Sequence, residues 1–382
     1  MDFNLTEEQG MLGDTVQRFV AKEYGFERRR SILKSPEGWS REVWKQLAEM
    51  GLLALQVPEE HGGMGAGAME TMLAMNAFGR ALLLEPYLSS AVLATGLLRE
   101  LGSAAQKKAL LPALAAGETI AVPAHGEEGE RHDLERVATS ATRAGDGWIL
   151  AGRKALVPHA PAADLLLVSA RTAGAVGDPA GLSLFAVRRD APGVTLAPRT
   201  MLDGHRAAEV TLAGVRVAGN DLLGPEGGAL APLTAVWDAG VAALCAEAVG
   251  ALQAILDATL EYARTRKQFG VPIGKFQALQ HRMADMLIHV EQARSMSYLA
   301  AMRCGEADAA LRGRALSAAK VVVGQACRFV GQQAVQIHGG MGMTDELDVT
   351  HFFRRLAAIE LSLGDTEHHL ERFVRLTRAE RA

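Results

Sequence analysis

The stretch Ala334–Asp345, AVQIHGGMGMTD, separates two long runs of helical periodicity and decides how the chain around it is organised. Gly339, Gly340 and Gly342 give the backbone freedom and remove side-chain bulk. Gln336 and His338 can present polar groups beside that bare backbone. Two interpretations remain open at this point: an ordinary turn between helices, or a segment at which a ligand approaches the main chain.

Length and composition place the chain among ordinary globular proteins. Its 382 residues exceed the usual size of one core, which predicts two or three packed units. Hydrophobic residues make up 49%, charged residues 22%, and the formal net charge is −4. This balance gives no reason to expect a nucleic-acid partner or an anionic membrane surface.

Cysteine use and the N-terminal sequence predict a cytoplasmic protein. Cys245, Cys304 and Cys327 are odd in number and widely spaced, which favours reduced thiols and no metal site. The N-terminus, MDFNLTEEQG, lacks the basic and then apolar order of a secretory signal. We also find no uncharged apolar run that is long enough to span a bilayer.

Residues 1–117 show helical periodicity almost throughout and predict an N-terminal helical domain. Asn4 and Thr6 are candidate caps for the first helix, and Ser40 is a candidate cap for a later one. The segment LLALQVPEEHGGMGAG then interrupts the pattern with Pro58 and several glycines, which predicts a loop.

Residues 118–229 change to short β-prone runs separated by Gly, Asp and Pro, which predicts a middle β domain, a small barrel or sandwich. The predicted strands are Thr119–Val122, Val137–Thr142, Trp148–Ala151, Leu165–Ser169, Leu182–Val187 and Glu209–Val217.

Residues 230–382 return to long helical runs, which predict an antiparallel bundle. The predicted helices are Leu233–Arg266, Gln277–Gly305, Ala307–Ile337, Leu347–Leu361 and Thr366–Arg378. The predicted fold is therefore mainly α with a central β domain: an N-terminal helical domain, a middle β-barrel and a C-terminal four-helix bundle.

A cluster of cations marks the end of the first long helix of the bundle. Arg264, Arg266 and Lys267 precede Phe269 in ARTRKQFG. Such charges suit the C-terminal end of a helix dipole. Alternatively, an arginine fork beside an aromatic ring can hold a pyrophosphate. The chain has no Walker A loop and no GxGxxG between a strand and a helix.

Other catalytic signatures are missing from the sequence. It contains neither GxSxG nor HExxH. Several histidines are isolated, and one adjacent pair lies on a polar helix face, so structural or surface roles are favoured over catalysis. These residues are His125, His132, His159 and His338, and the pair His368 and His369.

Two long motifs in this order are similar to those of the acyl-CoA dehydrogenase family: ARTRKQFGVPIGKFQALQHRMADM and QAVQIHGGMGMTDE. LLALQVPEEHGGMG in the first domain and AAEVTLAGVRVAGNDLLG at the end of the β domain also resemble that family. The resemblance covers essentially the entire chain. It implies the helical, β, helical fold and the oxidation of an acyl-CoA thioester.

The resemblance further implies FAD as cofactor, with its ADP half held by a neighbouring subunit, hence a dimer or a dimer of dimers. It implies electron-transfer flavoprotein as the electron acceptor. By this resemblance, Arg266 and Phe269 would hold the pyrophosphate and pack on the cofactor, and Gln277 would begin the next helix. Gln336, Gly339 and Gly340 would lie on the adenine side.

The resemblance implies a catalytic carboxylate at one of two positions, and this chain has a carboxylate at neither. A general base must be ionisable and within reach of the proton it removes. Leu363 occupies the first position and Gly240 the second. Asp365 and Glu247 are the candidate substitutes, with Glu360 as a third, and a surface or capping role is the alternative for each.

The β domain also departs from the family pattern. Where the resemblance implies a TEPxxGSD-like loop, this chain has VPAHGEEGERHDLER. Where an aromatic and a hydroxyl residue would touch the flavin ring, it has Leu156, Val157 and Pro158, and proline has no backbone N–H to donate.

These departures lead to three hypotheses. The first is a subunit resembling the small subunit of pimeloyl-CoA dehydrogenase-type two-subunit enzymes, in a heterotetramer with a catalytic chain and a role in fatty acid or dicarboxylic acid degradation. The second is a self-sufficient homodimeric or homotetrameric flavoenzyme with an unusual base. The third is a non-catalytic acyl-CoA-binding or scaffold protein.

Overall fold

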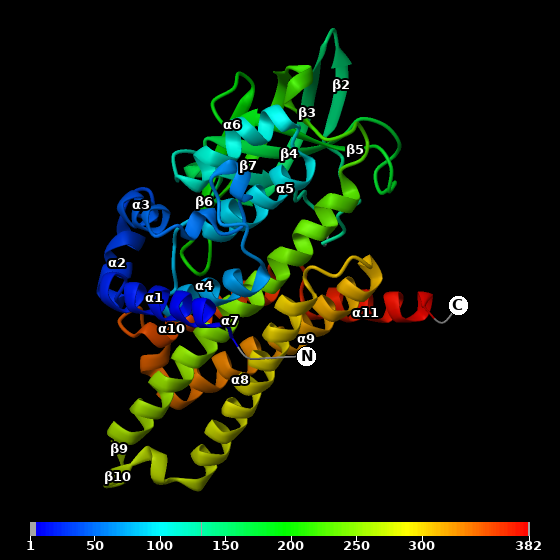
Figure 1. Cartoon of the computed structure of the whole chain (residues 1–382). Coiled ribbons are helices and arrows are strands. Elements are labelled where there is room, and N and C mark those ends of the chain that lie inside the picture. The colour runs from blue at the N-terminus through cyan, green and yellow to red at the C-terminus, as the bar shows by residue number, and fades with distance from the viewer. Residues whose placement is uncertain (1–4, 131, 381–382) are drawn as a thin grey trace. The chain divides into compact units, whose positions relative to one another are not determined.

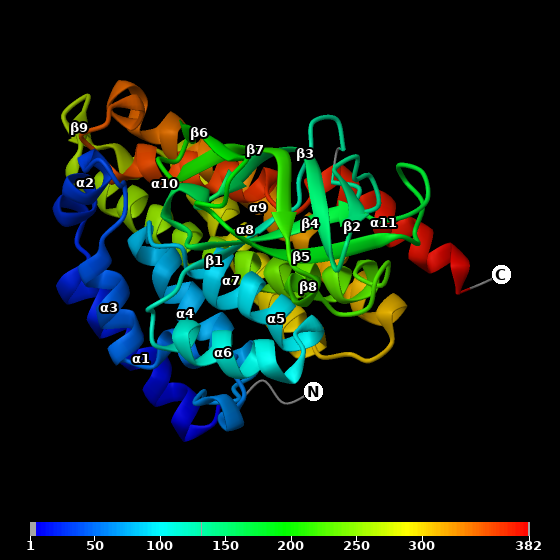
Figure 2. The same ribbon diagram turned by 90° about the horizontal axis from the view of Figure 1, so that it is seen from above.

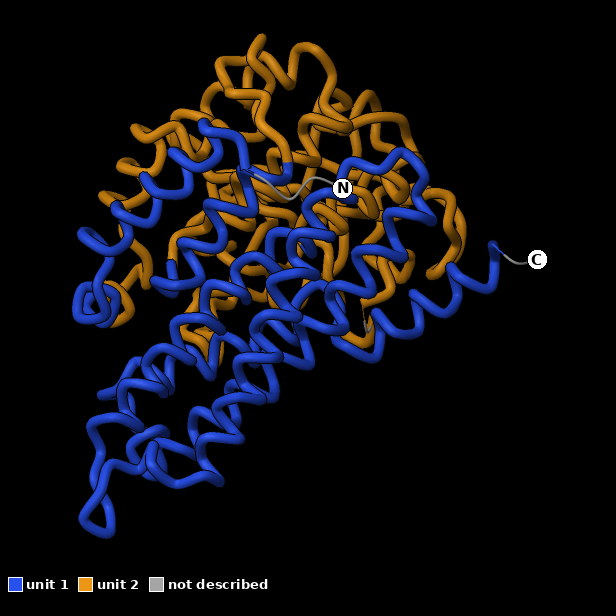
Figure 3. Tube along the Cα trace, turned by 60° about the horizontal axis from the view of Figure 1, so that its bottom comes forward, with its two compact units in different colours: residues 1–31, 68–83, 241–382 blue, residues 32–67, 84–240 orange. Residues whose placement is uncertain are grey.

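The computed structural model describes residues 5–130 and 132–380, which form two compact units (Figure 3). The first, called the helical unit below, comprises residues 1–31, 68–83 and 241–382. The second, called the sheet unit, comprises residues 32–67 and 84–240. The candidate cap Asn4 lies outside the described residues.

The helical unit is built around α9, which packs against α8, α10 and α11 (Figure 1). A second contact joins α1 to α4, and α4 also meets α8. The helices that contribute to this unit are α1 (Glu7–Glu23), α2 (Phe26–Lys34), α4 (Ala68–Ala81), α7 (Leu230–Thr265), α8 (Gln277–Arg303), α9 (Ala309–His338), α10 (Asp348–Leu361) and α11 (Thr366–Ala379).

Helix starts follow from capping side chains. The Thr6 hydroxyl accepts from the Gln9 backbone N–H while the Gln9 side chain accepts from Thr6 N–H, a complete capping box. Ser40 caps α3 (Arg41–Glu49) through Val43 N–H. Both caps were predicted from the sequence. α2 was not predicted, because FERRRSILK carries too few apolar residues to show a period.

The sheet unit contains one eight-stranded sheet, with the strand order β6-β7-β3-β2-β4-β5-β8 and β1 parallel to β4 (Figure 2). Its strands are β1 (Ala121–Ala124), β2 (Ser140–Ala144), β3 (Gly147–Pro158), β4 (Leu165–Arg171), β5 (Leu182–Arg188), β6 (Val194–Thr200), β7 (Arg206–Val217) and β8 (Leu222–Leu223). β6 was not predicted from the sequence because it contains Pro198. Proline is tolerated there since β6 is an edge strand.

Helices and short turns complete the sheet unit. A buried cluster joins them to the strands, with Leu97, Leu111, Leu167 and Leu184 at or near 0% exposure. The elements are α3, η1 (Leu52–Ala54), η2 (Glu59–His61), the π-helix η3 (Leu88–Ala94), α5 (Thr95–Leu101), α6 (Ala104–Ala115), η4 (Ala160–Ala162) and η5 (Gly219–Asp221). The π-helix η3 continues directly into α5.

Among the described residues, α7 is the one helix long and apolar enough to cross a membrane. In its most apolar stretch 83% of the residues are buried inside the protein. This burial is typical of a core helix.

Candidate functional site

The cation cluster lies on a β-hairpin directly after α7. β9 (Lys267–Gln268) and β10 (Val271–Pro272) pair antiparallel, and η6 (Ile273–Lys275) leads into α8. Phe269 and Gly270 form the two-residue turn with φ of 53° and 80°. Two positive φ angles are what a tight hairpin of this kind needs. The cation cluster at the end of α7 is therefore followed by a hairpin that projects from the helical unit (Figure 1).

The hairpin presents its side chains to the outside. The Phe269 ring is 92% exposed, and its nearest ring neighbour is Phe276, edge to face at 6.0 Å. Arg266 is also exposed, and within the described parts of the chain its guanidinium forms no ion pair. Arg264, by contrast, lies 3.8 Å from Glu261. An aromatic ring in water beside an uncompensated guanidinium suits a ligand with an apolar face and an anionic group.

The glycine segment follows α9 and forms the turn η7 (Gly339–Met343). Gly339 has φ of 63°, and a Cβ added to Gly339 or Gly340 would meet nothing within 4 Å. Gly342 differs, because its Cβ would lie 2.9 Å from Val335 O. Gly342 therefore serves close packing, while the first two glycines expose bare backbone, next to the exposed side chain of Gln336.

A ring stack brings the hairpin and the glycine segment to the same end of the helical unit. Tyr262, one turn before the end of α7, stacks on His338, the last residue of α9, with ring centroids 4.2 Å apart. The Tyr262 hydroxyl donates to His338 O at 3.4 Å, and His338 Nδ1 lies 2.8 Å from Ala334 O. Burial lowers the pKa of His338. His338 is thus a structural histidine. Five of the six predicted cofactor residues lie on the hairpin or the glycine segment, which this stack joins. The sixth, Gln277, is the first residue of α8.

The turn between α10 and α11 holds a leucine where the family resemblance implies a catalytic carboxylate. Leu363 has φ of 54°, which is rare for a bulky residue. The buried Lys320 ammonium donates to Glu360 O at 2.8 Å and to Gly364 O at 2.6 Å. His369 Nε2 lies 3.0 Å from Leu363 O. The turn is held by these buried groups, and the side chain at residue 363 has no ionisable group.

The candidate substitute bases are engaged in other contacts. Arg355 donates from Nε to Glu247 Oε1 at 2.6 Å and from Nη2 to Oε2 at 2.8 Å. Asp365 caps α11 by accepting from His368 N–H at 2.8 Å. Glu360 accepts from the Thr366 hydroxyl at 2.8 Å. The sequence offered a surface or capping role as the alternative for each carboxylate, and Asp365 takes the capping role. The buried pair between Glu247 and Arg355 was not predicted.

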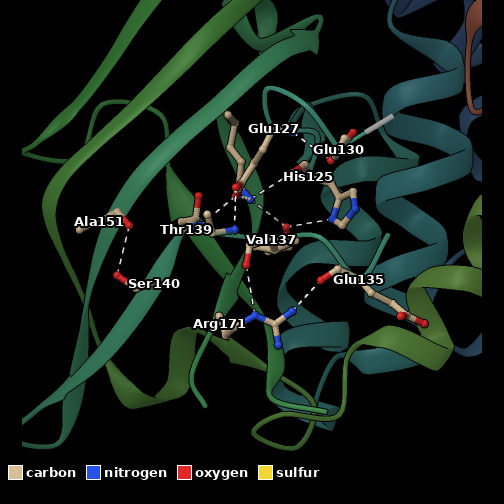
Figure 4. A network of polar contacts seen from close by, with 12 residues as sticks. His125, Glu127, Glu130, Glu135, Val137, Thr139, Ser140, Ala151 and Arg171 are labelled. Atoms are coloured by element: carbon tan, nitrogen blue, oxygen red, sulfur yellow. Dashed lines mark hydrogen bonds and ion pairs between the residues drawn. The ribbon is translucent and has the colours of Figure 1, made fainter. Parts of the chain in front are cut away.

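The sheet unit contains a buried polar network that the sequence did not reveal (Figure 4). Lys154, fully buried on β3, donates to Glu127 Oε1 at 2.6 Å, to His125 O at 3.0 Å and to Ser169 Oγ at 3.1 Å. Glu127 also accepts from the backbone N–H groups of Ala138 and Thr139. The loop that departs from the family pattern is therefore tied to the sheet by a satisfied ion pair.

His125 completes this network as a neutral imidazole. Its Nδ1 lies 2.9 Å from Ser169 Oγ, the same hydroxyl that accepts from Lys154. The ring meets Trp237 edge to face, with centroids 5.3 Å apart. Burial, together with the charge of Lys154, lowers the pKa of His125 to about 3. A charged imidazole does not fit this site.

His125 and His369 make folding sensitive to mild acid. Burial, with the charge of Lys320, also lowers the pKa of His369 to about 3 from an ordinary 6.5. Below pH 6.5 the unfolded chain takes up protons that the folded chain does not, so stability falls as pH falls, by up to about 1.4 kcal/mol per pH unit for each histidine. We expect His125→Asn to flatten the decline of the urea midpoint between pH 6.5 and about pH 5. The upper limit is the ordinary pKa of histidine, and below about pH 5 carboxylates also take up protons.

A matched control for this measurement is His281→Asn, since His281 is exposed. The control should keep the wild-type slope. An unchanged slope in His125→Asn would contradict the role given to this imidazole.

The strand β3 carries a bulge where the resemblance implies contacts to the flavin ring. The register with β7 shifts between Lys154 and Val157, and Leu156 at the bulge has φ of 42° and is 52% exposed. Val157 and Pro158 then pair with Ala208 and Ala207. The bulge turns an apolar side chain outward where an aromatic one was implied.

The chain is similar to known proteins along most of its length. Family models described as acyl-CoA dehydrogenase N-terminal, middle and C-terminal domains match residues 6–118, 124–215 and 236–376. The chain is 31% identical over 372 residues to the probable acyl-CoA dehydrogenase YngJ of Bacillus subtilis, covering 96% of this chain and 97% of that protein.

Solved structures of similar proteins match the fold over almost the whole chain. A chain of the ChsE4-ChsE5 complex from Mycobacterium tuberculosis matches with a TM-score of 0.89 and 30% identity over 99% of both chains. The glutaryl-coenzyme A dehydrogenase glutaryl-CoA complex matches with a TM-score of 0.91 and 28% identity, covering 99% of this chain and 97% of that one.

Proposed function

The chain belongs to the acyl-CoA dehydrogenase family, and from this premise we propose that it is the non-catalytic subunit of a two-component acyl-CoA dehydrogenase. The family is FAD-dependent, and FAD is the cofactor of this fold. In our proposal this chain completes a FAD site through its hairpin and glycine segment. A second chain of the same family supplies the catalytic carboxylate.

One observation carries the proposal: the residues that the resemblance assigns to the ADP half of FAD are present and exposed, while position 363 holds leucine. Arg266, Gly339 and Gly340 are exposed, and the two glycines leave open space over the backbone. These residues fit a pyrophosphate and a flat base, because an arginine fork binds phosphate and bare backbone admits close approach. FAD, when bound, would supply the acceptor for the hydride that leaves the acyl chain.

The candidate bases are already bound by other groups of the chain, which supports the same proposal. Glu247 is 5% exposed and bound at both oxygens by Arg355, so removal of a substrate proton would require breaking that pair. Asp365 is committed to the first turn of α11. One of the similar solved structures, the ChsE4-ChsE5 complex, pairs two differently named chains. Such a pairing is what we propose here, with electron-transfer flavoprotein as the acceptor and an acyl-CoA as substrate.

The test is co-expression with a candidate catalytic chain encoded beside this one, followed by native mass measurement and flavin counting. We expect this chain alone to bleach no flavin with a panel of short-chain, medium-chain and dicarboxylic acyl-CoA thioesters. The complex should contain flavin and be bleached. Arg266→Ala should strip flavin from the complex, because its guanidinium is the phosphate ligand in the proposal.

Arg264→Ala is the matched control, since Arg264 is also an exposed neighbour and already lies near Glu261. It should leave the flavin content unchanged. A yellow, active homo-oligomer without a second chain would instead support the self-sufficient enzyme. Protein that remains colourless with FAD and every candidate chain would support the scaffold.

A further inference from the structure

The C-terminal end of the glycine segment is held to the start of α10 by three side chains. The buried Thr350 hydroxyl donates to Gly342 O at 2.6 Å. His351 Nε2 lies 3.2 Å from Asp345 O. Arg354 donates to the Asp345 carboxylate at 2.6 Å, and this pair lies at the surface. Of the two buried side chains, Thr350 does not titrate, whereas the imidazole of His351 belongs to a group that can gain a proton near neutral pH.

Helix α2 determines the state of the His351 ring from its other nitrogen. Arg29 Nη1 lies 2.9 Å from His351 Nδ1, and Arg29 Nε donates to Leu82 O at 2.8 Å. A guanidinium group has N–H donors and no acceptor, so His351 Nδ1 accepts and the ring proton is on Nε2. Nε2 therefore donates to Asp345 O. The two hydrogen bonds of the ring form together only when the imidazole is neutral.

The surroundings of this ring oppose a positive charge. His351 is 5% exposed, and the Phe26 ring meets it edge to face, with centroids 5.1 Å apart. The charged groups that face it are Arg29 from α2, Arg354 from α10 and Asp345 from the glycine segment. Burial, with the charges of the two arginines, lowers the pKa of His351 from its ordinary 6.5.

A proton on Nδ1 would remove the acceptor for Arg29. Two N–H donors and two positive charges would then face each other across 2.9 Å in a buried site. The charged ring must turn or withdraw from Arg29, and either movement takes Nε2 away from Asp345 O.

We propose that His351 is a positioning residue for the glycine segment: the neutral imidazole holds the end of the segment against α10, and protonation of the ring releases it. Arg29 keeps the ring neutral, although it lies 322 residues earlier in the chain. The segment is the one that the proposed function assigns to the adenine side of FAD, so the consequence for the cofactor rests on that function. The role of His351 itself does not, and it can be tested without FAD.

The test is hydrogen exchange on the full chain without FAD, followed by mass spectrometry of peptides that cover residues 339–347. The rates are corrected for the intrinsic pH dependence of amide exchange. We expect the protection of this segment to be up to about tenfold lower at about pH 5.5 than at about pH 7.5. The reason is that the released ring takes up a proton with its ordinary pKa, about one unit above the lower pH, while the held ring does not.

Two variants of His351 make this result specific. His351→Gln has an acceptor for Arg29 and a donor for Asp345 O but no titratable ring, so the segment should be equally protected at both pH values. His351→Leu can form neither hydrogen bond, so the segment should exchange rapidly at both pH values. His281→Gln is the matched control, because His281 is an exposed histidine of the same unit and its replacement should keep the wild-type pH response.

Peptides from the middle of α9 show whether the effect is local. They report opening of the whole helical unit, including the effect of protonating His369. Their protection should fall less than that of the glycine segment between the two pH values. An equal fall in both would overturn the proposal, because the whole unit would then be opening.

A histidine with a purely structural role gives a different result. Protection of the wild-type segment would then be the same at both pH values, or His351→Gln would retain the full pH dependence, and either result would overturn the proposal. The dissociation constant of FAD in the two-chain complex tests the proposed function separately, and we expect it to rise by up to about tenfold at about pH 5.5. If the segment opens as expected but this constant does not change, the role of His351 is supported and the assignment of the segment to FAD fails.

Discussion

Replacing Arg355 by alanine is expected to destabilise the helical unit by about 3–5 kcal/mol. The guanidinium binds both oxygens of Glu247, at 2.6 and 2.8 Å, and both side chains are largely buried. Alanine would leave the buried Glu247 carboxylate without its counter-charge. The free-energy cost of that unpaired charge is larger than the net stabilisation that the intact ion pair provides. Urea unfolding followed by circular dichroism should show the fall in the midpoint.

Two further variants make this result specific. Arg354→Ala removes a guanidinium that pairs with Asp345 at the surface, and should cost at most about 1 kcal/mol. Replacing both Glu247 and Arg355 by leucine should recover much of the loss, because no charge is then left buried. A loss below about 1 kcal/mol in Arg355→Ala would show that water reaches Glu247, and would reopen it as a candidate base.

Local patterns in the sequence were sufficient for most of the helices and for their starts. Thr6 and Ser40 precede apolar periodic runs, and their hydroxyls cap those runs in the structure. The edge strand β6 was missed because Pro198 is a poor strand residue anywhere except at an edge. Edge position depends on strand order, which the residues of β6 do not encode locally.

The hairpin and the glycine segment could be predicted because each is a continuous motif. Their meeting point could not, since it rests on Tyr262 stacking on His338, 76 residues later. The buried lysines left a weak signal: Lys320 interrupts the apolar run ALSAAKVVVG, and a charge there needs buried acceptors. Which carbonyls accept from it depends on the turn at Leu363, and no local pattern gives that.

Two helical glycines also have a role that no local sequence pattern gives, and we expect their substitution to reduce stability strongly. Gly79 of α4 and Gly250 of α7 look like ordinary weak points of two helices. In the structure a Cβ on Gly79 would lie 1.9 Å from Glu247 O, and a Cβ on Gly250 would lie 1.9 Å from Asn76 O. The two helices therefore cross with backbone against backbone, and each glycine fits against the other helix.

We expect Gly250→Ala to destabilise the helical unit by at least about 3 kcal/mol, and Gly250→Val to prevent folding to a soluble product. The added methyl group would meet a carbonyl of α4, which cannot move away as a flexible side chain can. Gly10→Ala in α1 is the matched control, because it is also a helical glycine but nothing lies within 4 Å of its Cβ position. That variant should gain roughly 0.5–1 kcal/mol from helix propensity. If Gly250→Ala lowers the stability and Gly10→Ala raises it, contact between the two helices, and not helix propensity, requires glycine at residue 250. If Gly250→Ala instead raises the stability, the helices do not cross this closely.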